Sequence, residues 1–121
     1  MSIFDWLLVG HLVGDWILQS DWMAKGKKQG LFTWPGFIHF AVYTIVLIVL
    51  LWMAEGGARA PLLYLGMGLI IFVSHWLIDA TSIVNWWMRI YGQSQEFVRI
   101  IVDQTLHILI LALVATILLI G

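Results

Sequence analysis

Hydrophobic residues form long runs along this chain, and polar residues interrupt them at only a few places. Three apolar runs of at least about 17 residues are each long enough to cross a bilayer. A fourth, at the N-terminus, is broken only by a narrow polar stripe. We therefore predict an all-α, polytopic membrane protein whose single domain, residues 1–121, is a bundle of four transmembrane helices. These helices are expected over residues 3–20, 36–54, 61–85 and 97–120.

Loop and cap signals separate the predicted helices. Ser2 and Asp5 have the spacing of an N-terminal cap, with the acid favoured by the helix dipole. Residues 21–35 form a polar segment with three lysines and two glycines. Pro61 follows a short turn and is a favoured residue at the start of a helix. Because Asp5 lies in the first apolar run and no basic residue precedes it, we expect this run to be retained rather than removed as a signal peptide.

Composition supports the membrane assignment and excludes several classes of function. Hydrophobic residues make up 62% of the chain and charged residues 11%, against roughly half and a quarter in soluble domains. The lipid bilayer is therefore the expected partner. The basic residues are too few and too scattered for a nucleic-acid groove. The chain has no cysteine, which excludes disulfides, thiolate metal sites and a cysteine nucleophile.

The distribution of basic residues predicts the topology. With four spans, the two longer loops lie on one side of the membrane, and the other side carries Arg59 alone. Positive-inside asymmetry then places the longer loops in the cytoplasm and both termini outside. The basic residues on the cytoplasmic side are Lys25, Lys27, Lys28, Arg89 and Arg99.

A polar stripe runs along the first predicted helix. His11, Asp15 and Gln19 follow one another at a spacing of four, which keeps them on one face of an α-helix. A charged group at the bilayer centre costs roughly 3 kcal/mol on insertion scales, so a buried carboxylate must face the bundle interior and find a partner there. The stripe therefore predicts the inner face of this helix.

The other three helices repeat this pattern. His75 and Asp79 are four residues apart, Asp103 and His107 repeat the pair in reverse order, and His39 opens the second helix. Each predicted helix thus carries one of the four histidines. By the predicted topology, all of these groups fall in the cytoplasmic half of the bilayer, so we expect them to meet in one buried polar site.

This site has the composition of a divalent-metal centre. Imidazoles and carboxylates are the usual ligands of zinc, manganese and iron, and helical bundles build such centres from inward-facing pairs. A metal position open to water would make hydrolysis of a small or lipid-associated substrate feasible. Whether the protein is an enzyme stays open, and no catalytic residue is assigned. The candidate ligands are His11, Asp15, His75, Asp79, Asp103 and His107, with Gln19, Asp21, His39 and Gln104 in second rank.

Three other interpretations stay open. The His–Asp pairs would serve a purely structural role if they only lock the helices together. They would relay protons or pass a cation in a channel or transporter, which would require a homo-oligomer because four short helices make a thin pore. The polar band stops halfway, however, which favours a site that opens to the cytoplasm. Haem held between two histidines is less attractive, because axial histidines need no acids one turn away.

The motifs resemble those of a known family. The string His11-x3-Asp15-Trp-x2-Gln19-x-Asp21, the later His75-x3-Asp79 and the final Asp103-Gln104-x2-His107 are similar to the small bacterial membrane proteins called domain of unknown function 3307. The resemblance covers nearly the whole chain and includes His39; Trp16 stands where we expect phenylalanine. It implies a multi-pass protein of the bacterial inner membrane, and it implies no reaction.

Overall fold

The computed structural model describes residues 1–120, and within them the chain is helical with no strand. An α-helix, α1 (Ile3–Leu12), continues into a π-helical turn, η1 (Val13–Ile17). The short helix α2 (Asp21–Gly26) precedes the long helix α3 (Trp34–Glu55). The remaining helices are α4 (Pro61–Ala80), α5 (Ile83–Ile90) and α6 (Glu96–Ile120).

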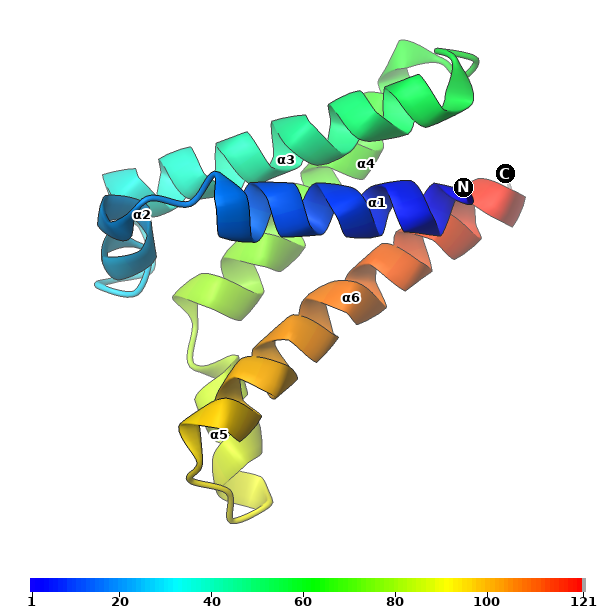
Figure 1. Cartoon of the computed structure of the whole chain (residues 1–121). Coiled ribbons are helices and arrows are strands. Elements are labelled where there is room, and N and C mark those ends of the chain that lie inside the picture. The colour runs from blue at the N-terminus through cyan, green and yellow to red at the C-terminus, as the bar shows by residue number, and fades with distance from the viewer. Residues whose placement is uncertain (121) are drawn as a thin grey trace.

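The long helices cross at an angle, with α6 diverging from α1 and α3 toward α5, and both termini lie at the same end of the bundle (Figure 1). Helix α1 lies along α3, while α4 and α6 complete the bundle. The short helices α2 and α5 lie far from the termini, beside the first residues of α3 and α6. The bundle therefore has one end that carries the termini and an opposite end that carries α2 and α5.

Three helices are long and apolar enough to cross a membrane. Helices α3, α4 and α6 have 22, 20 and 25 residues, with mean hydropathy of 2.4, 1.8 and 2.1. The first predicted helix, residues 3–20, is shorter in the structure, since α1 and η1 have 10 and 5 residues. At about 1.5 Å per residue these span about 22 Å, less than the roughly 30 Å of a bilayer core. Four spans therefore stay a prediction.

Two other boundaries differ from the predicted ones. The helix predicted over 61–85 ends at Ala80, because Thr81 is extended, with φ −104° and ψ 173°, before α5 begins. The predicted loop at 21–35 contains α2, whose first turn is capped by the Ser20 hydroxyl accepting a hydrogen bond from the backbone N–H of Met23. Local capping thus makes a helix that hydrophobic periodicity does not reveal.

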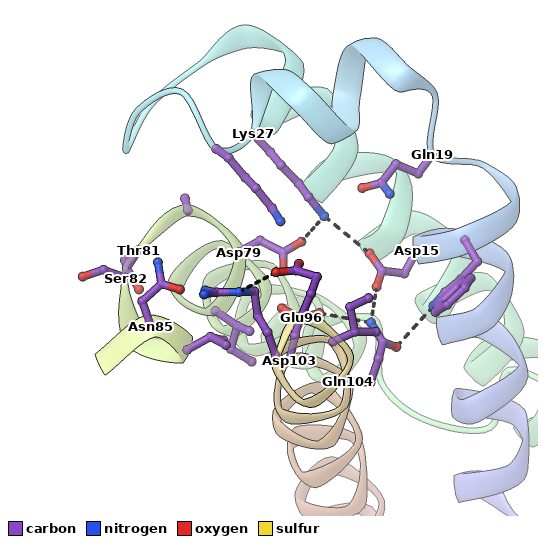
Figure 2. A pocket seen from close by; sticks show the side chains of 17 residues that line it. Asp15, Gln19, Lys27, Asp79, Thr81, Ser82, Asn85, Glu96, Asp103 and Gln104 are labelled. Carbon is purple, nitrogen blue, oxygen red and sulfur yellow. Dashed lines mark hydrogen bonds and ion pairs between the residues drawn. The ribbon is translucent and has the colours of Figure 1, made fainter. Parts of the chain in front are cut away.

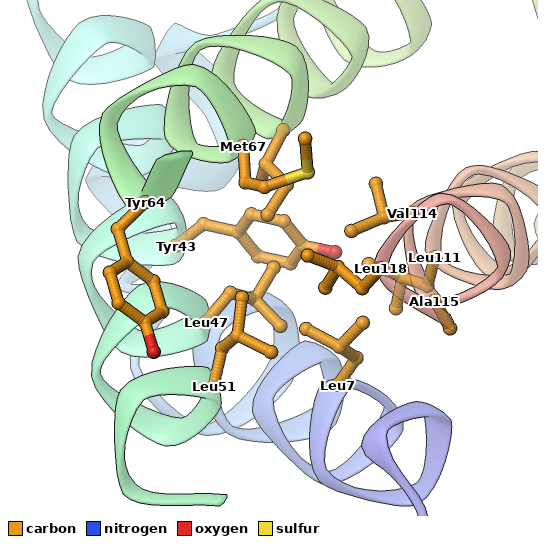
Figure 3. Packing of buried hydrophobic residues seen from close by; sticks show 11 residues of the cluster. Leu7, Tyr43, Leu47, Leu51, Tyr64, Met67, Leu111, Val114, Ala115 and Leu118 are labelled. Carbon is orange, nitrogen blue, oxygen red and sulfur yellow. The ribbon is translucent and has the colours of Figure 1, made fainter. Parts of the chain in front are cut away.

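An apolar core fills the half of the bundle near the termini. Leucine and valine side chains from α1, α3 and α6 meet there around Tyr43 (Figure 3). Each of these side chains is at most 2% exposed. This core separates the polar groups from the end of the bundle that carries the termini. Its aliphatic members include Leu7, Leu47, Leu51, Leu111, Val114 and Leu118.

Two glycines bring the first helix close to α3. A Cβ atom on Gly10 would lie 2.6 Å from Leu47 Cδ2, and one on Gly14 would lie 3.2 Å from the Cα atom of Tyr43. Small residues permit this backbone approach between membrane helices. The contact positions η1, and with it Asp15, against the first half of α3.

Candidate metal centre

Buried polar side chains gather beyond the apolar core, toward the end that carries α2 and α5. All four histidines are at most 2% exposed, and two aspartates and one lysine are buried with them. They come from η1, α1, α3, α4, α6 and the residue that follows α2. The buried polar residues are His11, Asp15, Lys27, His39, His75, Asp79 and His107.

The π-helical turn determines where Asp15 points. The backbone N–H of Leu18 donates to the carbonyl of Val13, five residues earlier, at 2.9 Å. A π-turn inserts an extra residue into helical register and is frequent at functional sites. His11 contacts Tyr43 and Gln104, whereas Asp15 contacts His39 and also faces the amide nitrogen of Gln104, so the two residues share one partner.

Four side chains bring one ligand atom each to a common point. His39 Nε2 lies 3.1 Å from Asp15 Oδ1, 3.0 Å from His75 Nε2 and 3.6 Å from Asp79 Oδ2. His75 Nε2 lies 2.8 Å from Asp79 Oδ2 and 3.5 Å from Asp15 Oδ1. All four atoms lie within 4.8 Å of one another. We call Asp15, His39, His75 and Asp79 the four-ligand group.

Five of the six spacings among these ligand atoms are compatible with a tetrahedral metal site, and the sixth, between the two carboxylate oxygens, is at most 4.8 Å. Zinc bonds to nitrogen and oxygen of about 2.0–2.1 Å place neighbouring tetrahedral ligands about 3.3 Å apart. The five distances above, from 2.8 to 3.6 Å, lie on both sides of that value.

A lysine that the sequence pattern did not single out reaches the same acids. Lys27 is 7% exposed, and its ammonium Nζ lies 2.7 Å from Asp79 Oδ2 and 4.0 Å from Asp15 Oδ1 (Figure 2). Sequence spacing carries no signal for this pair, because its members are 52 positions apart. Thr33 helps to place the lysine, since its hydroxyl donates to the carbonyl of Gly26 at 2.7 Å.

The buried charges do not balance. With neutral imidazoles, the carboxylates of Asp15 and Asp79 oppose the single ammonium of Lys27, and Asp103 adds a partly buried carboxylate. Buried charges are stable only when they are paired or coordinate a metal. The excess of acid therefore favours an additional cation or bound protons in this cluster.

A second group of potential ligands lies beside the first. His107 Nε2 is 3.0 Å from Asp79 Oδ1 and 3.8 Å from Asp103 Oδ2. Asp15, Asp103 and His107 each offer one ligand atom within 4.8 Å of the others. We call these residues the three-ligand group. Asp15 belongs to both groups, and Asp79 faces His75 with one oxygen and His107 with the other.

His11 lies outside both groups and is paired without a metal. Gln104 Oε1 accepts from Trp16 Nε1 at 3.2 Å and lies 2.7 Å from His11 Nε2. The Gln104 amide nitrogen faces Asp15 Oδ2 at 3.4 Å and Asp103 Oδ2 at 3.0 Å. This orientation makes His11 Nε2 a donor, so its Nδ1 accepts from the Tyr43 hydroxyl at 2.8 Å.

The outer nitrogens of two candidate ligands are unpaired. Among the described residues, neither His39 Nδ1 nor His75 Nδ1 has a hydrogen-bond partner, although both atoms are buried. Metal-binding histidines usually donate this N–H to a carboxylate or carbonyl, and losing that partner costs about 10–100-fold in affinity. We therefore expect the four-ligand group to bind zinc more weakly than a site with such partners.

A polar cavity of about 510 Å³ opens onto the acids from the side of α2, α5 and the start of α6 (Figure 2). Asp15, Asp79 and Asp103 lie in its wall, as does the second-rank candidate Gln19. Asp21, also of second rank, is exposed in the first turn of α2 and lies outside the cavity wall. Solvent and small solutes can therefore reach the carboxylates from one end of the bundle. The other polar lining residues include Lys28, Thr81, Ser82, Asn85, Glu96 and Arg99.

A sequence model of the family described as "Protein of unknown function (DUF3307)" matches residues 3–120. The chain belongs to this family. The match includes every residue of both ligand groups and confirms the resemblance seen in the motifs. No curated protein and no solved structure matches the chain. Because the DUF3307 description carries no activity, the function must be argued from the site.

Proposed function

We propose that this DUF3307 protein is an integral membrane protein that binds a divalent cation at the four-ligand group. The observation that carries the proposal is the tetrahedral spacing of two imidazole nitrogens and two carboxylate oxygens from η1, α3 and α4. This ligand set suits zinc best among the divalent metals considered, with manganese and iron as competitors. Binding would also offset the excess negative charge of Asp15 and Asp79.

We further propose that the centre serves hydrolysis of a small or lipid-associated polar substrate. The cavity of about 510 Å³ gives such a substrate access to the acids. Helix α5 lies near its opening and exposes Trp86 and Trp87, residues typical of a membrane–water boundary. With the basic loops facing the cytoplasm and both termini outside, the cavity would open to the cytoplasm of a bacterial cell from its inner membrane.

The apolar core argues against a transmembrane ion pathway. Leu7, Leu47 and Val114 are fully buried between the polar cluster and the end that carries the termini. Conduction requires polar groups or water along the whole path. The arrangement thus supports a site that is open at one end better than a channel or proton relay within one chain.

Metal analysis of the detergent-purified chain tests the proposal. After treatment with a chelator, the protein is titrated with zinc, and the metal retained after desalting is measured together with the visible spectrum. We expect saturable zinc binding, no Soret band, and at least a tenfold loss of affinity in both His39→Ala and His75→Ala.

His11→Ala is the matched control, because this histidine is equally buried but lies outside both ligand groups. It should bind zinc as the unmodified protein does. Absence of zinc binding in the unmodified chain would refute the metal centre and leave helix locking as the better explanation. Equal affinity in His39→Ala, His75→Ala and His11→Ala would show that zinc binds elsewhere.

A further inference from the structure

The four-ligand group has no evident place for a reacting water molecule. Its residues are between 0 and 7% exposed, and they already offer four ligands. Closed four-ligand zinc sites are typically structural, whereas catalytic zinc sites keep three protein ligands and leave one position open to water. A single cation in this group would therefore bind without giving hydrolysis an accessible water.

The three-ligand group differs in both respects. It offers only three ligand atoms, and the side chain of Asp103 is 29% exposed. Asp103 and Asp15 both lie in the wall of the polar cavity, whereas His107 closes the buried side. A cation held here would complete its coordination with water from the cavity.

The carboxylates are placed to join the two groups. Asp79 directs Oδ2 to His75 and Oδ1 to His107, at 2.8 and 3.0 Å. Asp15 directs Oδ1 to His39, and its Oδ2 faces the amide of Gln104. Carboxylates that divide their oxygens in this way can bridge two cations, which lie about 3.5–4 Å apart in two-metal hydrolytic sites.

We infer that the centre holds two divalent cations: one in the four-ligand group, and a second, water-bearing one between Asp15, Asp103 and His107. This inference rests on the proposed function, because Asp15 is common to both positions. With neutral imidazoles, three carboxylates and one lysine leave two negative charges, which one divalent cation balances, so the second cation would bring hydroxide or an anionic substrate group with it from the cavity. The first position would organise the bridging acids, and the second would face the substrate.

The stoichiometry of metal binding tests the inference on the full-length, detergent-purified chain. We expect two zinc ions per chain in the unmodified protein and one in both Asp103→Asn and His107→Gln. Asp21→Asn is the control, because Asp21 is an exposed acid outside both groups, and it should retain two. Thermal unfolding of each variant checks that a loss of metal does not reflect a loss of fold.

Manganese provides an independent readout of the distance between the ions. Two Mn²⁺ ions that share carboxylates should show a spin-coupled electron paramagnetic resonance spectrum, and Asp103→Asn should show the spectrum of isolated Mn²⁺. One zinc per unmodified chain would overturn the second position and leave intact only the proposed binding of one cation at the four-ligand group. Absence of bound metal would overturn both the second position and the proposed function. Two zinc ions in folded Asp103→Asn and His107→Gln would overturn the ligands assigned to the second position.

Discussion

The Nε2 atoms of His39 and His75 face each other at 3.0 Å, and both rings are buried from solvent. At this distance the two nitrogens cannot both carry a hydrogen, so at least one presents a lone pair to the other. Both also face the carboxylates of Asp15 and Asp79. A cation between the four atoms would satisfy all of them at once, whereas a shared proton would satisfy only one nitrogen pair.

The first prediction concerns stabilisation by zinc. A ligand that binds only the folded protein stabilises it by about 2.7 kcal/mol at 100 times its dissociation constant. Thermal unfolding in detergent, followed by tryptophan fluorescence, should therefore show a higher Tm with zinc in the unmodified protein and a smaller shift in His39→Ala. His11→Ala should keep the shift. An equal shift in His39→Ala would show that the stabilising zinc binds outside the four-ligand group.

The second prediction concerns Lys27 as a built-in competitor for the metal. Replacing it with methionine removes the ammonium 2.7 Å from Asp79 Oδ2 and leaves that acid unpaired. Breaking a buried pair costs roughly 3–5 kcal/mol. The metal-free Lys27→Met protein should therefore unfold at lower temperature, yet bind zinc at least about tenfold more tightly, because a nearby positive charge is gone.

Lys25→Met provides the control for this change, since Lys25 is exposed in α2, two residues before Lys27. It should alter neither the Tm nor the zinc affinity measured by titration. Weaker zinc binding in Lys27→Met would contradict competition and show that the lysine helps to hold the acids in place for the metal.

The third prediction concerns the glycine contact that positions Asp15. An alanine at Gly14 would place its Cβ 3.0 Å from Tyr43 Cδ2 and 3.2 Å from Tyr43 Cα, so η1 would have to move away from α3. Because Asp15 contacts His39 across this interface, Gly14→Ala should weaken zinc binding as well as lower the Tm.

Gly66→Ala is the matched control, because nothing lies within 4 Å of the added Cβ. Alanine is the better helix former by roughly 0.5–1 kcal/mol, so this variant should have a slightly higher Tm and unchanged zinc affinity. Normal zinc affinity in Gly14→Ala would mean that Asp15 keeps its position without the close contact.

Three of the four predicted membrane helices are long and apolar enough in the structure to cross a membrane, because length and hydropathy are properties of each segment on its own. The runs that became α3, α4 and α6 are long and apolar whatever they pack against. The π-turn was missed, because the spacing of polar residues is read on an α-helical period and does not reveal an extra residue in the register. A spacing of four suggested one face for His11 and Asp15, and both do contact Gln104, although only Asp15 belongs to the four-ligand group.

The spacing of residues along the sequence also does not predict which side chains on different helices contact one another. His39 ranked below the other histidines because it has no acid four residues away, yet the structure places it in the four-ligand group. Lys27 was assigned only to topology, because lysines in a polar loop ordinarily remain in water. The packing of α2 against α3 directs the side chain of Lys27 into the bundle, and only the three-dimensional structure reveals this position.

The fourth prediction separates helix locking from metal binding at Gln104. This side chain accepts from Trp16 and His11 and faces Asp15 and Asp103 with its amide nitrogen. Gln104→Leu leaves the buried His11 donor without an acceptor, which costs about 1–3 kcal/mol. The Tm should fall while zinc still binds, because neither ligand group includes Gln104.

Gln95→Leu is the control, because Gln95 is exposed before α6, and its Tm should not change.

Tyr43→Phe should be destabilising as well, since it removes the hydroxyl that donates to His11 Nδ1. The double variant should cost less than the sum of the single ones, because His11 joins both contacts. If the Tm changes of the two single variants add exactly in the double variant, the hydrogen-bonded Tyr43–His11–Gln104 chain does not act as a unit. Complete loss of zinc binding in Gln104→Leu would place this glutamine within the metal centre itself.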